Sequence, residues 1–269
     1  MIDFKKTRQY TLSIRLSTDG FCFAVHNPKV ANEYAYLPYR IDPSKPLTAN
    51  LKAAVEETEM LRHTYGAVNI LIADASYTLV PKEYYAEQYK EDFYKQAMGT
   101  TTNSIVLHNF VGDEHAVVLF GIERQLHRYL TTQYPKAHIV AAMTPLIHFG
   151  VEHSYTKNKR YCLLHLHKRC IDFMCYENAS PLFVNTFQYR DTADAMYYIL
   201  GCWSTLGLSQ TDDTLHIVGQ SRQGKTLTKE LEKFIQHIHL VRPAEEFHST
   251  ELARIDEMPF DLQVLIACE

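Results

Sequence analysis

The chain repeats one pattern of strands and helices, and this repetition limits the fold more than any other feature of the sequence. Segments 10–40 and 161–190 align when a one-residue gap is placed in the first turn, and Phe23 then meets Phe173. Each segment has an alternating strand, a short turn, a second alternating strand, a polar loop and a third strand. We therefore expect two copies of a three-stranded meander. Chance similarity between two amphipathic meanders is the alternative.

The parallel continues beyond the meanders. A helix is expected at about 47–64 in the first copy and at about 191–206 in the second, where Asp191 is suited to the N-cap and Gly207 to the helix end. The remaining elements follow in the same order in both copies. In the first copy we expect a buried strand at 67–76, a second helix at 82–97 and a further strand in the region 104–122. In the second copy we expect a buried strand at 213–221, a second helix at 225–236 and a further strand at 237–242.

This order predicts an α/β protein made of two mixed sheets of five-stranded type, each flanked by helices. A meander followed by crossover connections places antiparallel and parallel strands in one sheet. The polar stretch 153–160 separates the copies. We expect two domains, 1–156 and 157–269, with a cleft between them. The apolar segment 258–269 is expected to form a helix that docks on the sheets, with a partner-binding helix as the alternative.

The composition is that of a globular protein and excludes several classes. Hydrophobic residues make up 46% of the 269 residues and charged residues 22%. The net charge of −4 gives no reason to expect a nucleic-acid partner. No apolar run has the length of a membrane span, and no signal peptide is recognisable. The six cysteines form no C-x-x-C pair, so a reduced, cytoplasmic chain is expected.

A phosphate-loop pattern occurs near the end of the chain. Gly219 is followed, after four residues, by Gly224-Lys225-Thr226, which satisfies G-x-x-x-x-G-K-[ST]. In a phosphate-loop protein this motif follows the first strand, and a later strand supplies an aspartate for magnesium. Here the only strand expected after it, 237–242, carries no acid. This position argues against a working phosphate loop.

The same stretch has a structural explanation. Gly219 permits a tight exit from a strand, and Gly224 ends the loop before the next helix. The N-terminus of that helix lies beside Ser221, Arg222 and Lys225 and is predicted to attract an anion in any fold.

Two stretches resemble the actin-like ATPase superfamily, which includes actin, heat-shock chaperones, sugar kinases and pilus-assembly ATPases. Val218-Gly219-Gln220-Ser221 resembles its adenosine motif, with Gln220 where a second glycine is usual. Segment 69–93 resembles the strand, acidic-alanine turn, proline and helix of the first actin domain. The whole chain is similar to an uncharacterised bacterial family with an actin-like, ribonuclease H-like fold and no assigned function. The resemblance implies ATP, ADP or a small anion in the cleft.

The first phosphate hairpin departs from the superfamily pattern. Active members end the first strand of each hairpin with an aspartate and follow it with a glycine-rich turn, because backbone N–H groups must approach the phosphates and the acid organises magnesium. Segment 15–20 has one glycine, and its Asp19 lies in the turn beside Gly20. Asp-Gly is the ordinary signature of a tight hairpin turn.

The second hairpin, 165–170, has neither glycine nor acid. Lys168 and Arg169 could attract an anion but cannot bind magnesium. Efficient ATP hydrolysis is therefore not expected, and the chain resembles a degenerate ATPase. No cofactor beyond ATP or ADP is indicated.

Three functions follow from these observations. The first is a scaffold or regulatory protein that binds a nucleotide or small anion, and a protein partner, with weak or absent turnover. The second is a small-molecule kinase or ATPase with a rearranged site in which Asp74 or Asp19 is the acid. Asp74 ends a buried strand, where an acid can reach a ligand or cap a turn. The third is a phosphate-loop NTPase that uses 219–226.

Two His-x-His pairs place both rings on one face of a strand, at 165 and 167 and at 237 and 239. Such a pair can chelate a metal ion, but no carboxylate is evident nearby to complete either site. No metal site is therefore predicted, and the histidines are expected on a polar sheet face or in the cleft.

Overall fold

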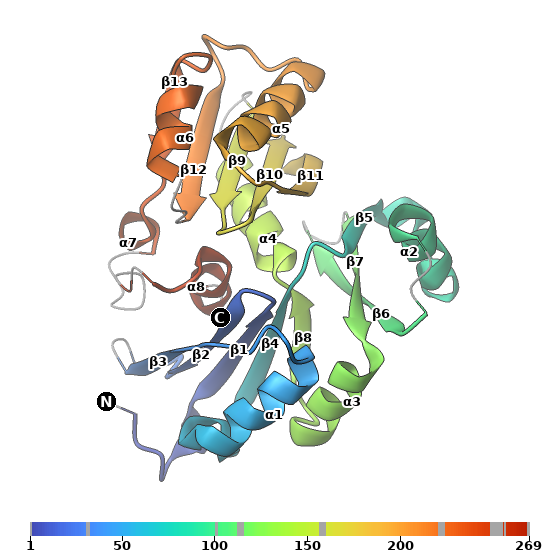
Figure 1. The fold of residues 1–269 in the computed structure, drawn as a ribbon, viewed down its shortest axis with the longest axis vertical. Helices are drawn as coiled ribbons and strands as arrows, with labels where there is room; N and C mark the ends of the chain where they lie inside the picture. Colours follow the sequence, from blue (N-terminus) through green and yellow to red (C-terminus); the bar gives the residue numbers. More distant parts are fainter. Residues whose placement is uncertain are drawn as a thin grey trace. The chain divides into compact units, whose positions relative to one another are not determined.

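The structure is a computed structural model that describes residues 2–30, 33–99, 102–111, 116–155, 160–219, 224–247, 255 and 257–267 (Figure 1). Its contacts divide the chain into two compact units, Met1–Pro145 with Ser249–Glu269, and Leu146–His248. The expected limit at 156 and 157 lies outside the described residues and stays a prediction. The contacts join the C-terminal segment to the first unit, although it follows the second unit in the chain.

The first unit contains a mixed five-stranded sheet in the order β3-β2-β1-β4-β8. Strands β1 to β3 form an antiparallel meander, while β4 is parallel to β1 and β8 is parallel to β4. The strands are β1 (Thr11–Ser17), β2 (Gly20–His26), β3 (Tyr34–Tyr39), β4 (Ala67–Ala73) and β8 (His138–Ala141).

The second unit contains a sheet of the same order, β11-β10-β9-β12-β13. The pairing directions are also the same, since β9 to β11 form the antiparallel meander and β12 and β13 run parallel to β9. The strands are β9 (Tyr161–Leu166), β10 (Cys170–Glu177), β11 (Ser180–Gln188), β12 (Thr214–Gly219) and β13 (His237–Leu240). The predicted fold class, an α/β protein with two mixed five-stranded sheets flanked by helices, is confirmed.

The register of the two meanders corrects one detail of the sequence comparison. Phe23 pairs with Ile14 across β1 and β2, and Phe173 pairs with Leu164 across β9 and β10. Because Phe23 and Phe173 are equivalent, Ile14 and Leu164 are equivalent too. The strands therefore correspond without the one-residue gap, and the gap was wrong.

A separate three-stranded antiparallel sheet, β5-β7-β6, is inserted in the first unit between β4 and α3. It is formed by β5 (Tyr77–Pro81), β6 (Ser104–Val111) and β7 (Ala116–Glu123). The helix α2 (Lys90–Met98) packs on it through Tyr94, in an apolar cluster with Val80, Val106, Val117 and Leu119. The expectation that 104–122 supplies the counterpart of strand 237–242 was therefore wrong.

The true counterpart of β13 is β8. The helix α3 (Arg124–Gln133) precedes β8 in the chain, as α6 (Gly224–Leu231) precedes β13. Periodicity could not reveal this, because strands of both sheets in the first unit show similar alternation.

Asn109 of β6 connects the inserted sheet to the end of β8. Its side chain is 8% exposed, and its Oδ1 accepts hydrogen bonds from the Ala141 N–H and the Thr144 hydroxyl, both at 2.9 Å. Its Nδ2 donates to the Ile139 carbonyl at 3.3 Å. Buried polar groups of this kind are costly to remove, because their partners stay buried without a hydrogen bond.

A helix follows each meander as predicted, but the first ends at Glu57 rather than at about 64. In the first unit α1 (Leu47–Glu57) follows Pro46 and passes into a 3-10 turn, Glu59–Arg62. In the second unit α5 (Thr192–Thr205) begins after Asp191, whose side chain accepts a hydrogen bond from the Asp194 N–H. Gly207 ends it with a φ of 63°, where the left-handed conformation favours glycine.

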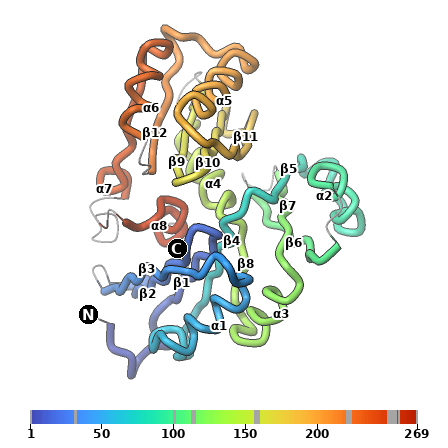
Figure 2. The backbone as a smooth tube through the Cα atoms, in the orientation of Figure 1, coloured from blue at the N-terminus to red at the C-terminus, as the bar shows by residue number. Residues whose placement is uncertain are grey.

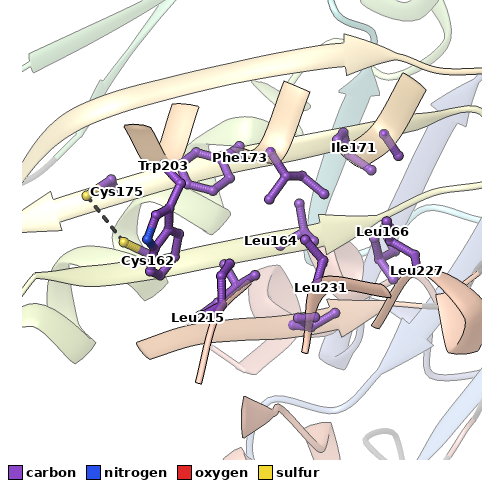
Figure 3. Packing of buried hydrophobic residues seen from close by; sticks show 14 of the residues in the cluster. Cys162, Leu164, Leu166, Ile171, Phe173, Cys175, Trp203, Leu215, Leu227 and Leu231 are labelled. Carbon is purple, nitrogen blue, oxygen red and sulfur yellow. Dashed lines mark hydrogen bonds between the residues drawn. The ribbon is translucent and has the colours of Figure 1, made fainter. Parts of the chain in front are cut away.

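The core of the second unit lies between the sheet and helices α5 and α6 (Figure 3). Leu164, Phe173 and Leu215 of the sheet pack in it with Trp203 of α5, and none of the four is more than 2% exposed. The cluster also contains Cys162, Leu166, Ile171, Cys175, Ala195, Ile199, Ile217, Leu227 and Leu231.

The buried cysteines behave as small apolar residues. The sulfur atoms of Cys162 and Cys175 lie 3.4 Å apart on neighbouring strands, and neither side chain is exposed (Figure 3). The contact with Cys175, together with burial, raises the pKa of the Cys162 thiol. This thiol is therefore protonated and unreactive at neutral pH.

The C-terminal helix α8 (Phe260–Ala267) packs on the first sheet (Figure 2). Leu262 and Ile266 contact Cys22 and Ala24 of β2 in a small apolar cluster. The prediction of a helix docked on a sheet is confirmed.

The remaining elements are η1 (Thr7–Gln9), η3 (Lys82–Tyr84), η4 (Glu87–Tyr89), α4 (Met143–Ser154) and α7 (Pro243–Glu246). Among the helices that the structure describes, none has both the length and the apolar character needed to cross a membrane.

Candidate functional site

The turns β1–β2 and β9–β10 are the positions at which the resemblance placed phosphate hairpins. In the first unit Arg15 lies opposite Cys22 in the register, and in the second His165 lies opposite Asp172. Because the two meanders correspond without a gap, Arg15 and His165 occupy equivalent positions. Each unit therefore has a basic side chain near the end of the first strand of its hairpin.

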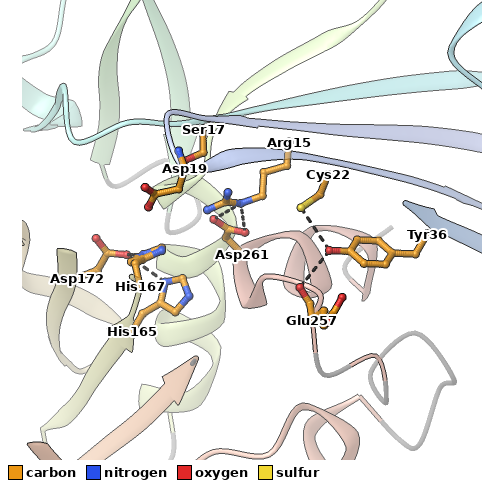
Figure 4. Close-up of polar contacts among 10 residues, drawn as sticks. All are labelled: Arg15, Ser17, Asp19, Cys22, Tyr36, His165, His167, Asp172, Glu257 and Asp261. Carbon is orange, nitrogen blue, oxygen red and sulfur yellow. Dashed lines mark hydrogen bonds and ion pairs between the residues drawn. The ribbon is translucent and has the colours of Figure 1, made fainter. Parts of the chain in front are cut away.

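Arg15 forms a buried ion pair with Asp261 of α8 (Figure 4). Its Nε donates to both carboxylate oxygens, at 2.7 and 2.9 Å. The two side chains are only 7% and 1% exposed. In this environment a charge requires a close partner, because burial removes its hydration. The C-terminal helix thus supplies the counter-charge for the first sheet.

A second polar contact ties the segment before α8 to the same sheet. The Tyr36 hydroxyl donates to the Glu257 carbonyl at 3.0 Å and lies 3.3 Å from the Cys22 sulfur (Figure 4). Burial raises the pKa of Tyr36, so the hydroxyl is protonated and can act as the donor.

The first turn itself carries Asp19 and Gly20. Asp19 is exposed, and its backbone N–H donates to the Ser17 hydroxyl at 3.2 Å. Gly20 has a φ of 139°, which other residues rarely adopt. The turn is therefore a tight hairpin, and its single glycine adopts the backbone conformation that the turn requires.

The second turn carries a hydrogen-bonded triad centred on Asp172 (Figure 4). The Asp172 Oδ2 lies 3.0 Å from His165 Nδ1 and 2.6 Å from His167 Nε2. The other oxygen, Oδ1, accepts a hydrogen bond from the Thr186 hydroxyl of β11 at 2.6 Å. Three neighbouring chain segments thus converge on one carboxylate.

The electrostatics of this triad favour an ionised carboxylate. Burial alone would raise the pKa of Asp172, but the charge of His167 and the hydrogen bonds from His165 and His167 together lower that pKa below its usual value. His165 is 2% exposed and His167 is 18% exposed at the side chain, so the triad reaches the surface through His167.

Asp172 was not predicted from the sequence as a partner of the first His-x-His pair. The expectation that no carboxylate lies near this pair was wrong, since Asp172 lies directly opposite His165. The signal was present in the hairpin register: if Lys168 and Arg169 are the turn, then residues 165 and 172 face each other.

The other predicted site residues are distributed over the two units. In the first unit Asp74 is exposed, and its carboxylate accepts a hydrogen bond from the Ser76 N–H at 2.8 Å, which is a turn-capping contact. In the second unit Lys168, Arg169 and Lys225 are exposed. Gln220, Ser221 and Arg222 lie outside the described residues.

Gly219 ends β12 in a conformation that only glycine tolerates well. Its φ is 89°, and a Cβ at this position would lie 2.5 Å from the Leu166 carbonyl oxygen and 3.0 Å from the His165 ring. Both conformation and close approach therefore require glycine. By contrast, Gly207 also has a positive φ, of 63°, but has open space where a Cβ would be.

The phosphate-loop pattern lies between β12 and α6, a strand-to-helix context as predicted. Its magnesium partner is missing from the neighbouring strands: β12 pairs with β9 and β13, and neither strand contains an acidic residue. A P-loop site needs such an acid to hold the metal.

A second group of polar aromatic residues covers β9 and β12 in the same unit. The His216 ring stacks on Tyr161 with centroids 4.3 Å apart, and His239 lies 5.5 Å away. His153 Nε2 lies 3.0 Å from Glu246 Oε2. Burial lowers the pKa of His216 to about 4, against a smaller opposing effect of its hydrogen bond with the Cys162 carbonyl. This histidine is therefore neutral at pH 7.

Comparison with known proteins identifies the fold family. The family described as "Protein of unknown function (DUF3822)" matches residues 1–238. A crystal structure from Bacteroides thetaiotaomicron VPI-5482, described as a protein with actin-like ATPase fold and unknown function, is 35% identical, covers 100% of both chains and has a TM-score of 0.89. No curated protein sequence matches significantly.

A more distant structure is that of a PilM-PilN type IV pilus biogenesis complex. It is 12% identical, covers 97% of this chain and 98% of the other, and has a TM-score of 0.59. At this identity the likeness concerns the fold alone. With two sheets of matching order, a matched family and a 35% identical relative, the chain belongs to the DUF3822 family of unknown function and has an actin-like ATPase fold.

Proposed function

We propose that this protein is a scaffold or regulatory protein that keeps the actin-like fold but has weak or absent nucleotide turnover. The observation that carries the proposal is the state of the two equivalent hairpin positions. Arg15 is held by Asp261, and His165 is held by Asp172. Both carboxylates are buried with a basic partner, whereas magnesium-dependent hydrolysis needs an acid that faces the metal and its water.

Binding without turnover remains compatible with the fold. Gly219 provides the tight exit from β12, and the exposed Lys225 lies in the first turn of α6, where an anion is favoured. The proposed ligand is therefore ATP, ADP or a small anion in a cleft between the domains. The proposed location is the cytoplasm.

A protein partner is the second part of the proposal. One protein of similar fold is known in a pilus biogenesis complex with another protein. Loss of the groups that position phosphate and magnesium, in a chain that keeps the rest of the fold, supports a role in binding.

The test is titration calorimetry with Mg-ATP and Mg-ADP, combined with a turnover assay. We expect either no binding or binding without turnover. Phosphate release at about 1 s⁻¹ or faster, the lower range of ordinary enzymes, would refute the proposal. Any activity must be lost in Gly219→Ala and kept in Gly207→Ala, which excludes a contaminating ATPase.

The two enzymatic alternatives make different predictions in the same assays. A rearranged kinase or ATPase requires Asp74→Asn or Asp19→Asn to abolish phosphoryl transfer, and the capping contact of Asp74 with the Ser76 N–H speaks against that role. A phosphate-loop NTPase requires Lys225→Ala to remove nucleotide binding, and retained affinity would exclude it.

A further inference from the structure

The second hairpin combines three potential metal ligands on a rigid sheet. His165 and His167 lie on one face of the β9 strand and its extension, and Asp172 lies opposite on β10. Their ligand atoms, one from each side chain, all lie within 4.8 Å of one another. Figure 4 shows both rings directed at the same carboxylate.

From this geometry we propose that His165, His167 and Asp172 bind a divalent transition-metal ion, such as zinc, in the second unit. The inference goes beyond the proposed function and does not depend on it. Two imidazole nitrogens and one carboxylate oxygen are a donor set that suits zinc and its neighbours in the first transition row rather than magnesium, which prefers oxygen ligands.

The distances allow the ion with small movements. Zinc bonds to histidine nitrogen and carboxylate oxygen are about 2.0–2.2 Å, so neighbouring ligand atoms of a tetrahedral site lie roughly 3.3–3.5 Å apart. The observed separations from Asp172 Oδ2 are 3.0 Å to His165 and 2.6 Å to His167. The ion takes the place of the protons in these two hydrogen bonds, and Asp172 Oδ2 moves away from each ring nitrogen by less than about 1 Å.

The surroundings orient the ligands for this role. The Thr186 hydroxyl holds Asp172 Oδ1, which leaves Oδ2 directed at the two rings. Hydrogen bonds of this outer kind fix the ligating carboxylate and tune its affinity for metal. Asp172 is 4% exposed, so the site is sheltered, while His167 connects it to the surface.

Three protein ligands leave one position for water or an anion. Lys168 and Arg169 follow His167 in the turn, and both are exposed. Their positive charge favours an anion as the fourth ligand.

The experiment is a titration of the full, untagged chain with Zn²⁺ after treatment with a chelator. Co²⁺ serves as a spectroscopic probe, because its visible absorption reports nitrogen and oxygen coordination. We expect one ion per chain, with micromolar or tighter affinity. His237→Gln is the matched control, since His237 is an exposed histidine of the same unit outside the site.

Two variants test the assignment without removing a fully buried group. His167→Gln should weaken Zn²⁺ binding by more than about 100-fold, and Thr186→Val by about 10- to 100-fold, the range for outer-sphere partners. Trp203 fluorescence checks that each variant is folded. No stoichiometric binding by the unmodified chain, or equal affinity in His167→Gln and His237→Gln, would overturn the proposal.

Discussion

The ion pair between Arg15 and Asp261 is expected to be the most sensitive single contact of the first unit. Asp261→Asn keeps the shape of the side chain but removes the negative charge that pairs with the buried Arg15. Both side chains are more than nine-tenths buried, and the two hydrogen bonds measure 2.7 and 2.9 Å. Breaking a buried pair in this way costs about 3–5 kcal/mol, a large share of the 5–15 kcal/mol typical of a folded protein.

Removing both charges should cost much less than removing one. In Arg15→Met with Asp261→Leu, apolar side chains of similar length fill the same space and no charge remains to be desolvated. We expect the double variant to lie within about 1 kcal/mol of the unmodified protein or to be more stable. The exposed pair Lys233–Glu230 is the control, and Glu230→Gln should change stability by less than about 1 kcal/mol.

Urea unfolding followed by far-UV circular dichroism measures these differences, and hydrogen exchange of peptides from β1 and α8 shows where they arise. Asp261→Asn should lose amide protection in α8, because the helix is held partly by this contact. Trp203 is the only tryptophan and lies in the second unit, so its fluorescence is a readout from outside the mutated unit. A cost below about 1 kcal/mol for Asp261→Asn, or a double variant as unstable as the two single variants combined, would refute the reasoning.

Three further predictions concern single positions. Gly219→Ala should destabilise the second unit by about 2–4 kcal/mol and Gly207→Ala by about 1 kcal/mol, because both strain a positive φ but only the first places a Cβ against the Leu166 carbonyl oxygen. Equal losses in urea unfolding followed by Trp203 fluorescence would contradict this. Burial lowers the pKa of His216 to about 4 in the folded chain, so the unfolded chain takes up the proton first and the free energy of unfolding should fall by roughly 2–3 kcal/mol as the pH drops from about 6.5 to 4. His216→Gln should flatten this pH dependence, and an unchanged slope would exclude His216 as its source. Asn109→Ala should cost about 2–3 kcal/mol and reduce amide protection at Ala141, whereas full protection in hydrogen exchange would show that water replaces the side chain.

Much of the fold could be predicted because its signals are local. Asp191 and Gly207 marked the ends of α5, since capping and the left-handed conformation depend on a few adjacent residues. The strand order of the meanders followed from alternation and short turns. The inserted sheet was misassigned, because the alternation of β6 and β7 predicts strands but not which sheet they join.

The candidate site was predicted only in part. Gly219 was recognised from its place between a strand and a helix, and the structure adds the reason, the close approach of the Leu166 carbonyl. Histidines 165 and 167 were noticed as a pair, but their carboxylate was not. The partner of Arg15 could not have been found from the pattern, because it lies 246 residues away in the chain.

The sequence by itself therefore determined the two meanders with the helix and the buried strand that follow each, the ends of α5 and the absence of glycine-rich phosphate turns. These depend on hydrogen bonds and side-chain periodicity within short stretches of chain. Only the tertiary structure decided which charges meet. Asp172 reaches His165 and His167 through the register of a hairpin, and Asp261 reaches Arg15 because α8 returns to the first sheet. Because these charges are buried and have lost their hydration, the stability of the fold depends on the partner that lies beside each of them.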